Sequence, residues 1–462
     1  MVDIFVPGRA FGHTANISAS GFSFYGIGTC QRAGCGALKL AAIAIIASGV
    51  VVAAVLGLVF LSGPIEFAPV AEPAKPDTRP ISALTSPDDN RPTIADPALK
   101  ARLVADGLDF PTSMAFVDNN GTLLALEKNT GKVIMISGGI KKPILQVSVA
   151  KGAEQGLLGI TVEGTNPKYV FLYFTETNSN GNLLGNRIYR YEWDSVNKAL
   201  VNAKLVLDLP AIPGPIHNGG KMTVGKGGEL FATIGDLNRD GGPLGNKQSG
   251  EIDDTSVIIR MDINGEPLPD NPFVSYGRRS MDYYYAYGIR NSFGLAVDPL
   301  TGKLWETENG ADKFDELNVV PPGFNSGWKK LMGPIALSNV TESQLFHLQG
   351  SKYADPVFSW RHSVGLTDIE FFTSDKLGEK YKNNIFVGDY NAGQLYFFKV
   401  NKARDGVETT GHLSDHIADS YDESLEIRLG LFPGGVVDLA TGPDGYLYVL
   451  TFSGKVYRLE PV

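Results

Sequence analysis

An all-β, six-bladed β-propeller is the fold that this sequence predicts, and three observations lead to it. A two-strand unit with alternating aliphatic and aromatic residues recurs six times after residue 97. A further apolar strand precedes the copies, and helix signals are sparse in this part of the chain. Alternation bounded by glycine and Pro-Asp turns marks strands, and a repeated meander of three or four strands is typical of a propeller.

The repeats differ in length, which indicates loops inserted between strands. The six two-strand units are expected at residues 121–136, 169–191, 229–261, 302–320, 384–398 and 445–459. The leading strands are expected at residues 113–118, 157–162, 221–225, 294–299, 367–372 and 437–444. The units are longer and less even than WD40 repeats, which indicates a looser type of propeller. A tandem of β-sandwiches is the alternative fold.

The N-terminal part predicts a membrane anchor and a spacer. Residues 40–61 carry no charge, and at 1.5 Å per residue this stretch can cross a hydrocarbon core of about 30 Å. It is long for a signal peptide, and basic residues dominate before it, which predicts a cytoplasmic N-terminus. Residues 62–96 are rich in proline and predict an extended linker. The expected order is a cytoplasmic tail (1–39), a transmembrane anchor (40–61), the linker and an extracytoplasmic propeller (97–462).

Composition narrows the function. The net charge of −9 is spread along the chain, which argues against a nucleic-acid partner because phosphates require a basic surface. The two cysteines, Cys30 and Cys35, precede the predicted propeller, so no disulfide framework is expected to support its fold.

Polar residues stand directly beside four of the apolar strands. They lie in segments 154–159 (Glu-Gln-Gly-Leu-Leu-Gly), 216–221 (Ile-His-Asn-Gly-Gly-Lys), 287–295 and 308–318. The innermost strands of a propeller converge on a central channel, so these residues are expected to meet at one end of it. Each segment also has a structural interpretation, such as a hydrogen-bonded histidine or a solvated loop acid. Segment 235–242 alternates acids with glycines, and an Asx-rich turn is favoured there over a metal site.

These motifs resemble those of the quinoprotein glucose/sorbosone dehydrogenases, the soluble aldose sugar dehydrogenases. The matching strings are His217-Asn-Gly-Gly-Lys-Met, Gly288-Ile-Arg-Asn-Ser-Phe-Gly-Leu, and Glu308-Asn-Gly-Ala followed by Asp315-Glu-Leu-Asn. The resemblance covers roughly residues 97–462 and implies a six-bladed propeller that binds pyrroloquinoline quinone and calcium. It implies oxidation of an aldose sugar or related alcohol, with a protein or a quinone as the later electron acceptor.

The resemblance also implies roles for individual residues. His217 matches the base that removes the hydroxyl proton, and Arg290 matches the arginine that polarises the quinone oxygens. Gln155 and Asn291 match polar neighbours of the cofactor or sugar. Gly310 and Ala311 match carbonyl ligands of calcium, with Asp315 nearby, and oxygen ligands suit this ion.

Two departures from the family pattern concern the cofactor. Lys221 stands where the family has arginine, which removes bidentate recognition at that point. The late segments expected at the cofactor contain Thr367 and Asn391 but no basic residue, and Arg361 is the candidate substitute. Because carboxylates in a partly buried site need cationic partners, these departures predict a changed cofactor contact.

Two other functions fit the same scaffold. A calcium-dependent lactonase or other hydrolase would use a channel calcium and His217 to activate water. A non-catalytic binding propeller at the cell surface would need neither the histidine nor the metal.

Overall fold

The computed structural model describes residues 91–462, except for 165–166 and 240–241. The described residues form six sheets, and the prediction of an all-β propeller is confirmed. The predicted anchor, residues 40–61, lies outside this part of the chain. Within the described residues no helix is both long and apolar enough to cross a bilayer.

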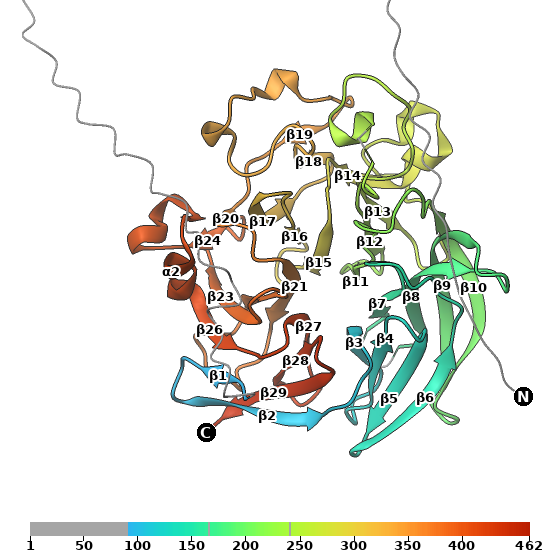
Figure 1. The fold of residues 1–462 in the computed structure, drawn as a ribbon, viewed down its shortest axis with the longest axis vertical. Coiled ribbons are helices and arrows are strands. Elements are labelled where there is room, and N and C mark those ends of the chain that lie inside the picture. The colour runs from blue at the N-terminus through green and yellow to red at the C-terminus, as the bar shows by residue number, and fades with distance from the viewer. Residues whose placement is uncertain (1–90, 165–166, 240–241) are drawn as a thin grey trace, which may run out of the picture. The chain divides into compact units, whose positions relative to one another are not determined.

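The first three sheets follow one another along the chain (Figure 1). The first contains β3 (Pro111–Phe116), β4 (Leu123–Glu127), β5 (Lys132–Ser137) and β6 (Ile140–Gln146). The second contains β7 (Leu157–Val162), β8 (Tyr169–Thr177), β9 (Leu183–Asp194) and β10 (Ala199–Leu209). The third contains β11 (Met222–Val224), β12 (Leu230–Ile234), β13 (Val257–Met261), β14 (Tyr284–Tyr287), β18 (Phe324–Asn325) and β19 (Lys352–Tyr353).

The other three sheets complete the ring. The fourth contains β15 (Ser292–Val297), β16 (Leu304–Glu308), β17 (Lys313–Val320), β20 (Phe358–His362) and β25 (Ile417–Ala418). The fifth contains β21 (Leu366–Phe372), β22 (Asn384–Asp389), β23 (Gln394–Val400), β24 (Val407–Glu408), β26 (Arg428–Leu431) and β1 (Thr93–Ile94). The sixth contains β27 (Val436–Thr441), β28 (Leu447–Thr451), β29 (Lys455–Pro461) and β2 (Leu99–Ala105).

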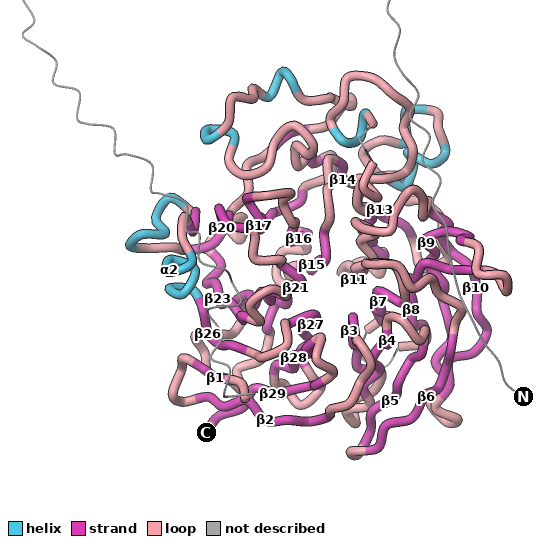
Figure 2. The backbone as a smooth tube through the Cα atoms, in the orientation of Figure 1, coloured by secondary structure: helices cyan, strands magenta, loops and turns pink. Residues whose placement is uncertain are grey.

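Among the described residues, helical structure is confined to short turns in the connections (Figure 2). The 3₁₀ turns are η2 (Pro243–Gly245), η3 (Val274–Tyr276), η4 (Arg279–Tyr283), η5 (Ile335–Leu337), η6 (Glu342–Gln344), η7 (Gly411–Asp415) and η8 (Leu425–Ile427). The α-helical turn α2 (Tyr421–Ser424) has four residues.

Apolar side chains hold neighbouring sheets together. Each of six buried clusters lies between two adjacent sheets, so the described residues share no single central core. For example, Phe171 and Tyr173 of the second sheet pack with Leu230 and Ile259 of the third. The inner strands β3, β7, β11, β15, β21 and β27 contact one another in a closed circle. These strands therefore surround a common axis.

The two ends of the described chain close the ring. Strand β2 pairs antiparallel with β29, with Leu99 opposite Pro461 and Leu103 opposite Tyr457. Strand β1 pairs with β26 in the fifth sheet. Thr93 and Ile94 of β1 fall within residues 62–96, which were predicted to be linker. The sequence does not reveal this strand, because its pairing partner is more than 300 residues away and leaves no local signal.

Candidate active site

A cavity of about 520 Å³ lies where the first residues of the inner strands meet. Each of the six inner strands, or the segment directly before it, contributes to the wall, which includes Thr112, Leu158, Lys221, Asn291, Thr367 and Asp438. Ligand sites usually have volumes of this order and combine an apolar lining with a few convergent polar groups.

His217 is held in a strained turn at the edge of this cavity. Its backbone has φ +61°, and Gly219 and Gly220 follow with φ +62° and +106°. A Cβ atom on Gly220 would lie 2.8 Å from Cβ of Leu158, so glycine is required by both conformation and space. The His217 amide donates to a carboxylate oxygen of Glu154 at 2.6 Å, which fixes the turn.

The imidazole of His217 is oriented by a buried carboxylate. Its Nδ1 lies 2.5 Å from Oδ1 of Asp236, and Oδ2 of Asp236 accepts from the indole of Trp328 at 2.9 Å. His217 and Asp236 are both buried. A carboxylate on Nδ1 favours the tautomer with its proton there, which leaves the Nε2 lone pair free to act as a base.

Arg290 lines the same cavity and is fixed on three sides. Its amide donates to Glu308 at 2.6 Å, and its guanidinium donates to the Asn309 carbonyl at 2.9 Å. The guanidinium also lies 5.2 Å from the ring centre of Trp328, so one indole contacts both Arg290 and the partner of His217. Burial raises the pKa of Glu308 to about 7, which makes this carboxyl a group that titrates near neutral pH.

Glu154 organises a second polar edge of the cavity. Besides the His217 amide, it accepts from Nδ2 of Asn291 at 3.2 Å. Lys128 also lines the cavity, and burial lowers its pKa while the charge of Glu154 opposes that shift. Cationic and neutral donors thus converge on one face of the site.

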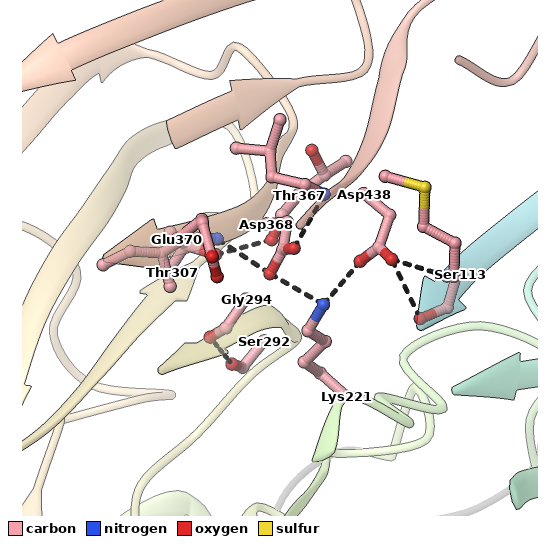
Figure 3. A network of polar contacts seen from close by, with 12 residues as sticks. Ser113, Lys221, Ser292, Gly294, Thr307, Thr367, Asp368, Glu370 and Asp438 are labelled. Atoms are coloured by element: carbon pink, nitrogen blue, oxygen red, sulfur yellow. Dashed lines mark hydrogen bonds and ion pairs between the residues drawn. The ribbon is translucent and has the colours of Figure 1, made fainter. Parts of the chain in front are cut away.

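Lys221 lines the cavity, and its ammonium group lies between two carboxylates (Figure 3). Its ammonium group lies 2.8 Å from Asp368 and 2.5 Å from Asp438, carboxylates of the fifth and sixth sheets. Burial alone would lower the pKa of Lys221, but the attraction of both carboxylates outweighs it and raises the pKa. Burial raises the pKa of Asp368 well above its usual range. A second cavity of about 470 Å³ begins beyond this cluster and also contacts Lys221.

A comparison of the sequence with models of known protein families agrees with the propeller fold and the cavity. Residues 108–458 match the family model described as Glucose / Sorbosone dehydrogenase. The chain belongs to the glucose/sorbosone dehydrogenase family. The family is named for sugar dehydrogenases, and the chain is an oxidoreductase of this family.

Individual relatives cover nearly the whole propeller. The aldose sugar dehydrogenase YliI of Escherichia coli is 27% identical over 376 residues, which cover 79% of this chain and 94% of the relative. A glucose dehydrogenase crystal structure is 25% identical, with a TM-score of 0.62, and the match covers 78% of this chain and 99% of that one. The aldose sugar dehydrogenase of Streptomyces coelicolor, solved with pyrroloquinoline quinone bound, shares the fold at 24% identity and a TM-score of 0.59, over 80% and 100% of the two chains.

The structure brings together five residues that the sequence predicts for this family site. His217, Lys221, Arg290, Asn291 and Thr367 all line the cavity. Lys221, however, is already neutralised by two carboxylates.

Three predicted cofactor residues lie elsewhere. The cavity wall contains Glu154 and Tyr390 in place of their neighbours Gln155 and Asn391. The Gln155 side chain instead lies beside Gly152 and Gly214, and that of Asn391 lies beside Gly365. Arg361 forms an ion pair with Asp419 at 2.5 Å and stacks near Phe314.

The predicted calcium site consists of the backbone carbonyls of Gly310 and Ala311 and, nearby, the carboxylate of Asp315. Asp315 accepts hydrogen bonds from the amides of Gly310, Val364 and Gly365 and from the hydroxyl of Ser363. Its oxygens therefore fix two loops, and burial raises the pKa of Asp315. No group of three or more His, Cys, Asp or Glu side chains among the described residues could hold a metal. The carbonyl oxygens of Gly310 and Ala311 stay the candidate ligands beside the cavity residue Asn309.

The cavity wall fits an anionic quinone through Lys128 and Arg290, whereas its unpaired amide oxygens are acceptors that suit a hydroxyl group or a cation. Arg290 Nε, Asn291 Oδ1 and Asn309 Oδ1 are buried and have no hydrogen-bond partner within the described part of the chain. All three belong to residues that line the cavity. Buried polar atoms normally have partners, so these atoms indicate where a bound ligand would complete the hydrogen bonding. Lys128 and Arg290 would supply positive charge to its carboxylates.

Several site residues share one position that the sequence motifs did not reveal, immediately after the second strand of a sheet. These cavity residues are Lys128 after β4, Asn309 after β16, Tyr390 after β22 and Phe452 after β28. Asp236 follows β12 in a similar way and meets His217 across the β11–β12 hairpin. The Asx turn expected in this segment is present, since Asp236 also accepts from the Asn238 amide. The repeat itself was thus the available signal for these positions.

The Lys221 cluster makes a stability prediction. Replacing Lys221 by methionine leaves Asp368 and Asp438 buried without a cation, and such losses cost about 3–5 kcal/mol. We expect the free energy of unfolding of Lys221→Met, measured by urea denaturation at pH 7, to fall by an amount in this range. Lys221→Arg, which keeps the charge, should lose less.

Asp368→Asn is the matched comparison. Because this change removes one of the two buried acidic groups and keeps the ammonium group paired with Asp438, it should cost less than loss of the lysine. Equal losses for Lys221→Met and Asp368→Asn, or a loss below about 1 kcal/mol for Lys221→Met, would contradict a cluster held by the ammonium charge.

Proposed function

We propose that this protein oxidises the CH–OH group of an aldose sugar or related alcohol, with pyrroloquinoline quinone in the cavity as hydride acceptor. The observation that carries the proposal is His217, whose Nδ1 is held by Asp236 in a cavity shared with Arg290. The aldose sugar dehydrogenase activity in the name of the Escherichia coli relative and the bound quinone in the Streptomyces coelicolor structure support it.

His217 receives the substrate proton. A sugar hydroxyl that enters the cavity can donate to the free Nε2, and this nitrogen takes the proton as the C–H bond gives up its hydride. Asp236 stabilises the imidazolium that results, without taking the proton itself. The Glu154 carboxylate holds the backbone of His217, so the ring need not move during the reaction.

Arg290 supplies fixed positive charge in the same cavity as the base. Pyrroloquinoline quinone, when bound, provides the carbonyl carbons and oxygens that accept hydride and negative charge. The hydrogen bonds of Arg290 to Glu308 and Asn309 hold it in place in advance, so charge developing near the guanidinium is stabilised without reorganisation. The carbonyls of Gly310 and Ala311 would hold calcium nearby.

Reconstitution tests this function. The purified propeller, loaded with pyrroloquinoline quinone and calcium, should reduce a dye with aldoses as donors. His217→Gln should lower kcat by about 10²- to 10⁴-fold, because general-base catalysis contributes that much, while quinone affinity measured by absorbance titration stays near the wild-type value.

Asp236→Asn tests the tautomer of the His217 ring, because it keeps the size of the side chain and removes the carboxylate. It should also lower kcat, since an amide can donate to Nδ1 and so favours the wrong tautomer. The proposal fails if the loaded protein oxidises no aldose and binds no quinone. Lactone hydrolysis that needs calcium but no quinone would assign the site to the alternative function.

We also propose that residues 40–61 anchor the propeller outside the cytoplasm. The uncharged stretch and the basic residues before it support this arrangement. The full chain should remain in the membrane fraction after carbonate extraction, and deletion of residues 1–61 should release it. External protease should digest the propeller in intact spheroplasts. A full chain recovered in the soluble fraction would contradict the anchor.

A further inference from the structure

Two buried acids lie at the border between the two cavities and have no part in the sugar oxidation described above. Asp438 lines the reaction cavity, whereas Asp368 lines the second cavity. Among the described residues, Lys221 is the one that both walls share. Its ammonium group lies 2.5 Å from Asp438 and 2.8 Å from Asp368, so a chain of polar contacts joins the two cavities (Figure 3).

The border divides consecutive residues of two inner strands. Thr367 on β21 lines the reaction cavity and Asp368, the next residue, lines the second cavity. Asp438 and Leu439 on β27 are divided in the same way. Backbone amides fix both acids, since Asp438 accepts from Met114 at 2.6 Å and Asp368 accepts from Leu439 at 2.9 Å. The two carboxyl groups are therefore held in place between two spaces.

The two acids form a pair that holds a proton. Burial is the main cause that raises the pKa of Asp368, the charge of Lys221 opposes it, and the charge of Asp438 and a hydrogen bond with it add to the rise. Two carboxyl groups that share a site do not both ionise readily, so one proton is held between them. Lys221 balances the remaining negative charge. The other groups that face the pair are Glu370 and the hydroxyl of Ser113, which donates to Asp438 at 3.2 Å.

The second cavity connects this pair to the protein surface. Its volume of about 470 Å³ has room for several water molecules. Its wall includes Glu370, which accepts from the amide and the hydroxyl of Thr441 at 2.9 and 2.6 Å. The wall also includes the exposed residues Asn119 and Thr373. Polar groups and space for water thus continue from Asp368 to solvent on the side of the border that does not face His217.

We propose that Asp438 and Asp368 form a proton path through the centre of the propeller, which carries the proton of the substrate hydroxyl from the reaction cavity to the second cavity. The inference rests on the proposed function, because oxidation of a CH–OH group to a carbonyl releases two protons and two electrons. The electrons leave with the dye or another acceptor. Substrate and cofactor cover His217 when they fill the reaction cavity, so a route on the other side lets the base return to its neutral form.

Each step of the path conserves protons and charge. The N–H bond formed at Nε2 of His217 breaks, and the proton passes through water in the reaction cavity to a carboxyl oxygen of Asp438, where an O–H bond forms. The proton that the pair already holds moves from Asp368 to water in the second cavity. His217 is then neutral again, and the pair and Lys221 carry the same total charge as before.

Asp368→Asn interrupts the path, because an amide does not take up and release this proton, while Asp438 keeps its ion pair with Lys221. We expect kcat for an aldose in the dye-linked assay to fall at least about 10-fold, since a positioned proton-transfer group contributes this much or more. The first reduction of bound quinone, measured by stopped flow, should keep its wild-type rate, because a neutral His217 is present at the start.

Rescue and a matched variant separate a proton path from a structural role. Imidazole added to the assay should restore much of the lost kcat of Asp368→Asn, because a small base that enters the cavity can remove the proton. Asp118→Asn, at another acid in the wall of the second cavity, should leave kcat unchanged. An unchanged kcat for Asp368→Asn, or equal losses in kcat and in the first turnover without rescue, would overturn the path.

Infrared spectroscopy before any turnover separates this inference from the proposed function. The difference spectrum between wild type and Asp368→Asn should contain the band of a protonated carboxyl group that shifts in D₂O. This shift should be as fast with pyrroloquinoline quinone bound as without it, because the second cavity supplies the route. If no aldose is oxidised but these results hold, the function fails and the proton path stands. Absence of the band, or exchange that stops when quinone binds, would overturn the path.

Discussion

Closure of the ring of sheets is the constraint on which the site depends. Strand β2, at the start of the described chain, completes the sheet formed by β27, β28 and β29 at its end. Without this pairing the first and last sheets would be open to separate, and β3 would lose its contact with β27. The cavity wall draws on residues from Pro111 to Phe452, so its geometry exists only in the closed ring.

Within that ring, buried charged side chains lie around the central cavity, where the apolar clusters between the sheets end. The six apolar clusters fix neighbouring sheets to each other, but buried polar residues beside the starts of the inner strands must find partners around the axis. Asp438 satisfies this requirement by accepting from Met114 at 2.6 Å while it holds Lys221, and so joins the first, third and sixth sheets. The same logic applies to Asp236, Glu154 and Glu308, each of which holds a residue that faces the cavity.

The strands nearest the axis were predictable, because two buried faces and tight turns produce alternating apolar runs between glycines. The outer strands were harder to find. Strand β6 reads Ile-Lys-Lys-Pro-Ile-Leu-Gln and is largely exposed, so solvent rather than packing determines its composition. The strands β1 and β2 depend on partners at the other end of the chain, and no local pattern can reveal them.

In the site, too, residues in short motifs were predictable from the sequence, whereas contacts between distant segments were not. His217, Arg290 and Asn291 belong to short motifs, and the structure places them together. Lys221, which stands where the family has arginine, and Arg361, the candidate substitute, both have acidic partners supplied by other segments. Lys128 and Asp236 carry no motif of their own, and they gain their places from the repeated strand ends.

The protonation of the His217 ring tests the account most directly, since the assignment of a base depends on the contact between Nδ1 and Asp236. Nitrogen-15 NMR of the histidine-labelled propeller, in the pH range where the ring is neutral, distinguishes the two tautomers. We predict a protonated Nδ1 and an unprotonated Nε2 for His217, with the preference reduced in Asp236→Asn. A ring protonated at Nε2 and bare at Nδ1 would contradict the account, because the nitrogen available to the substrate would then be a donor.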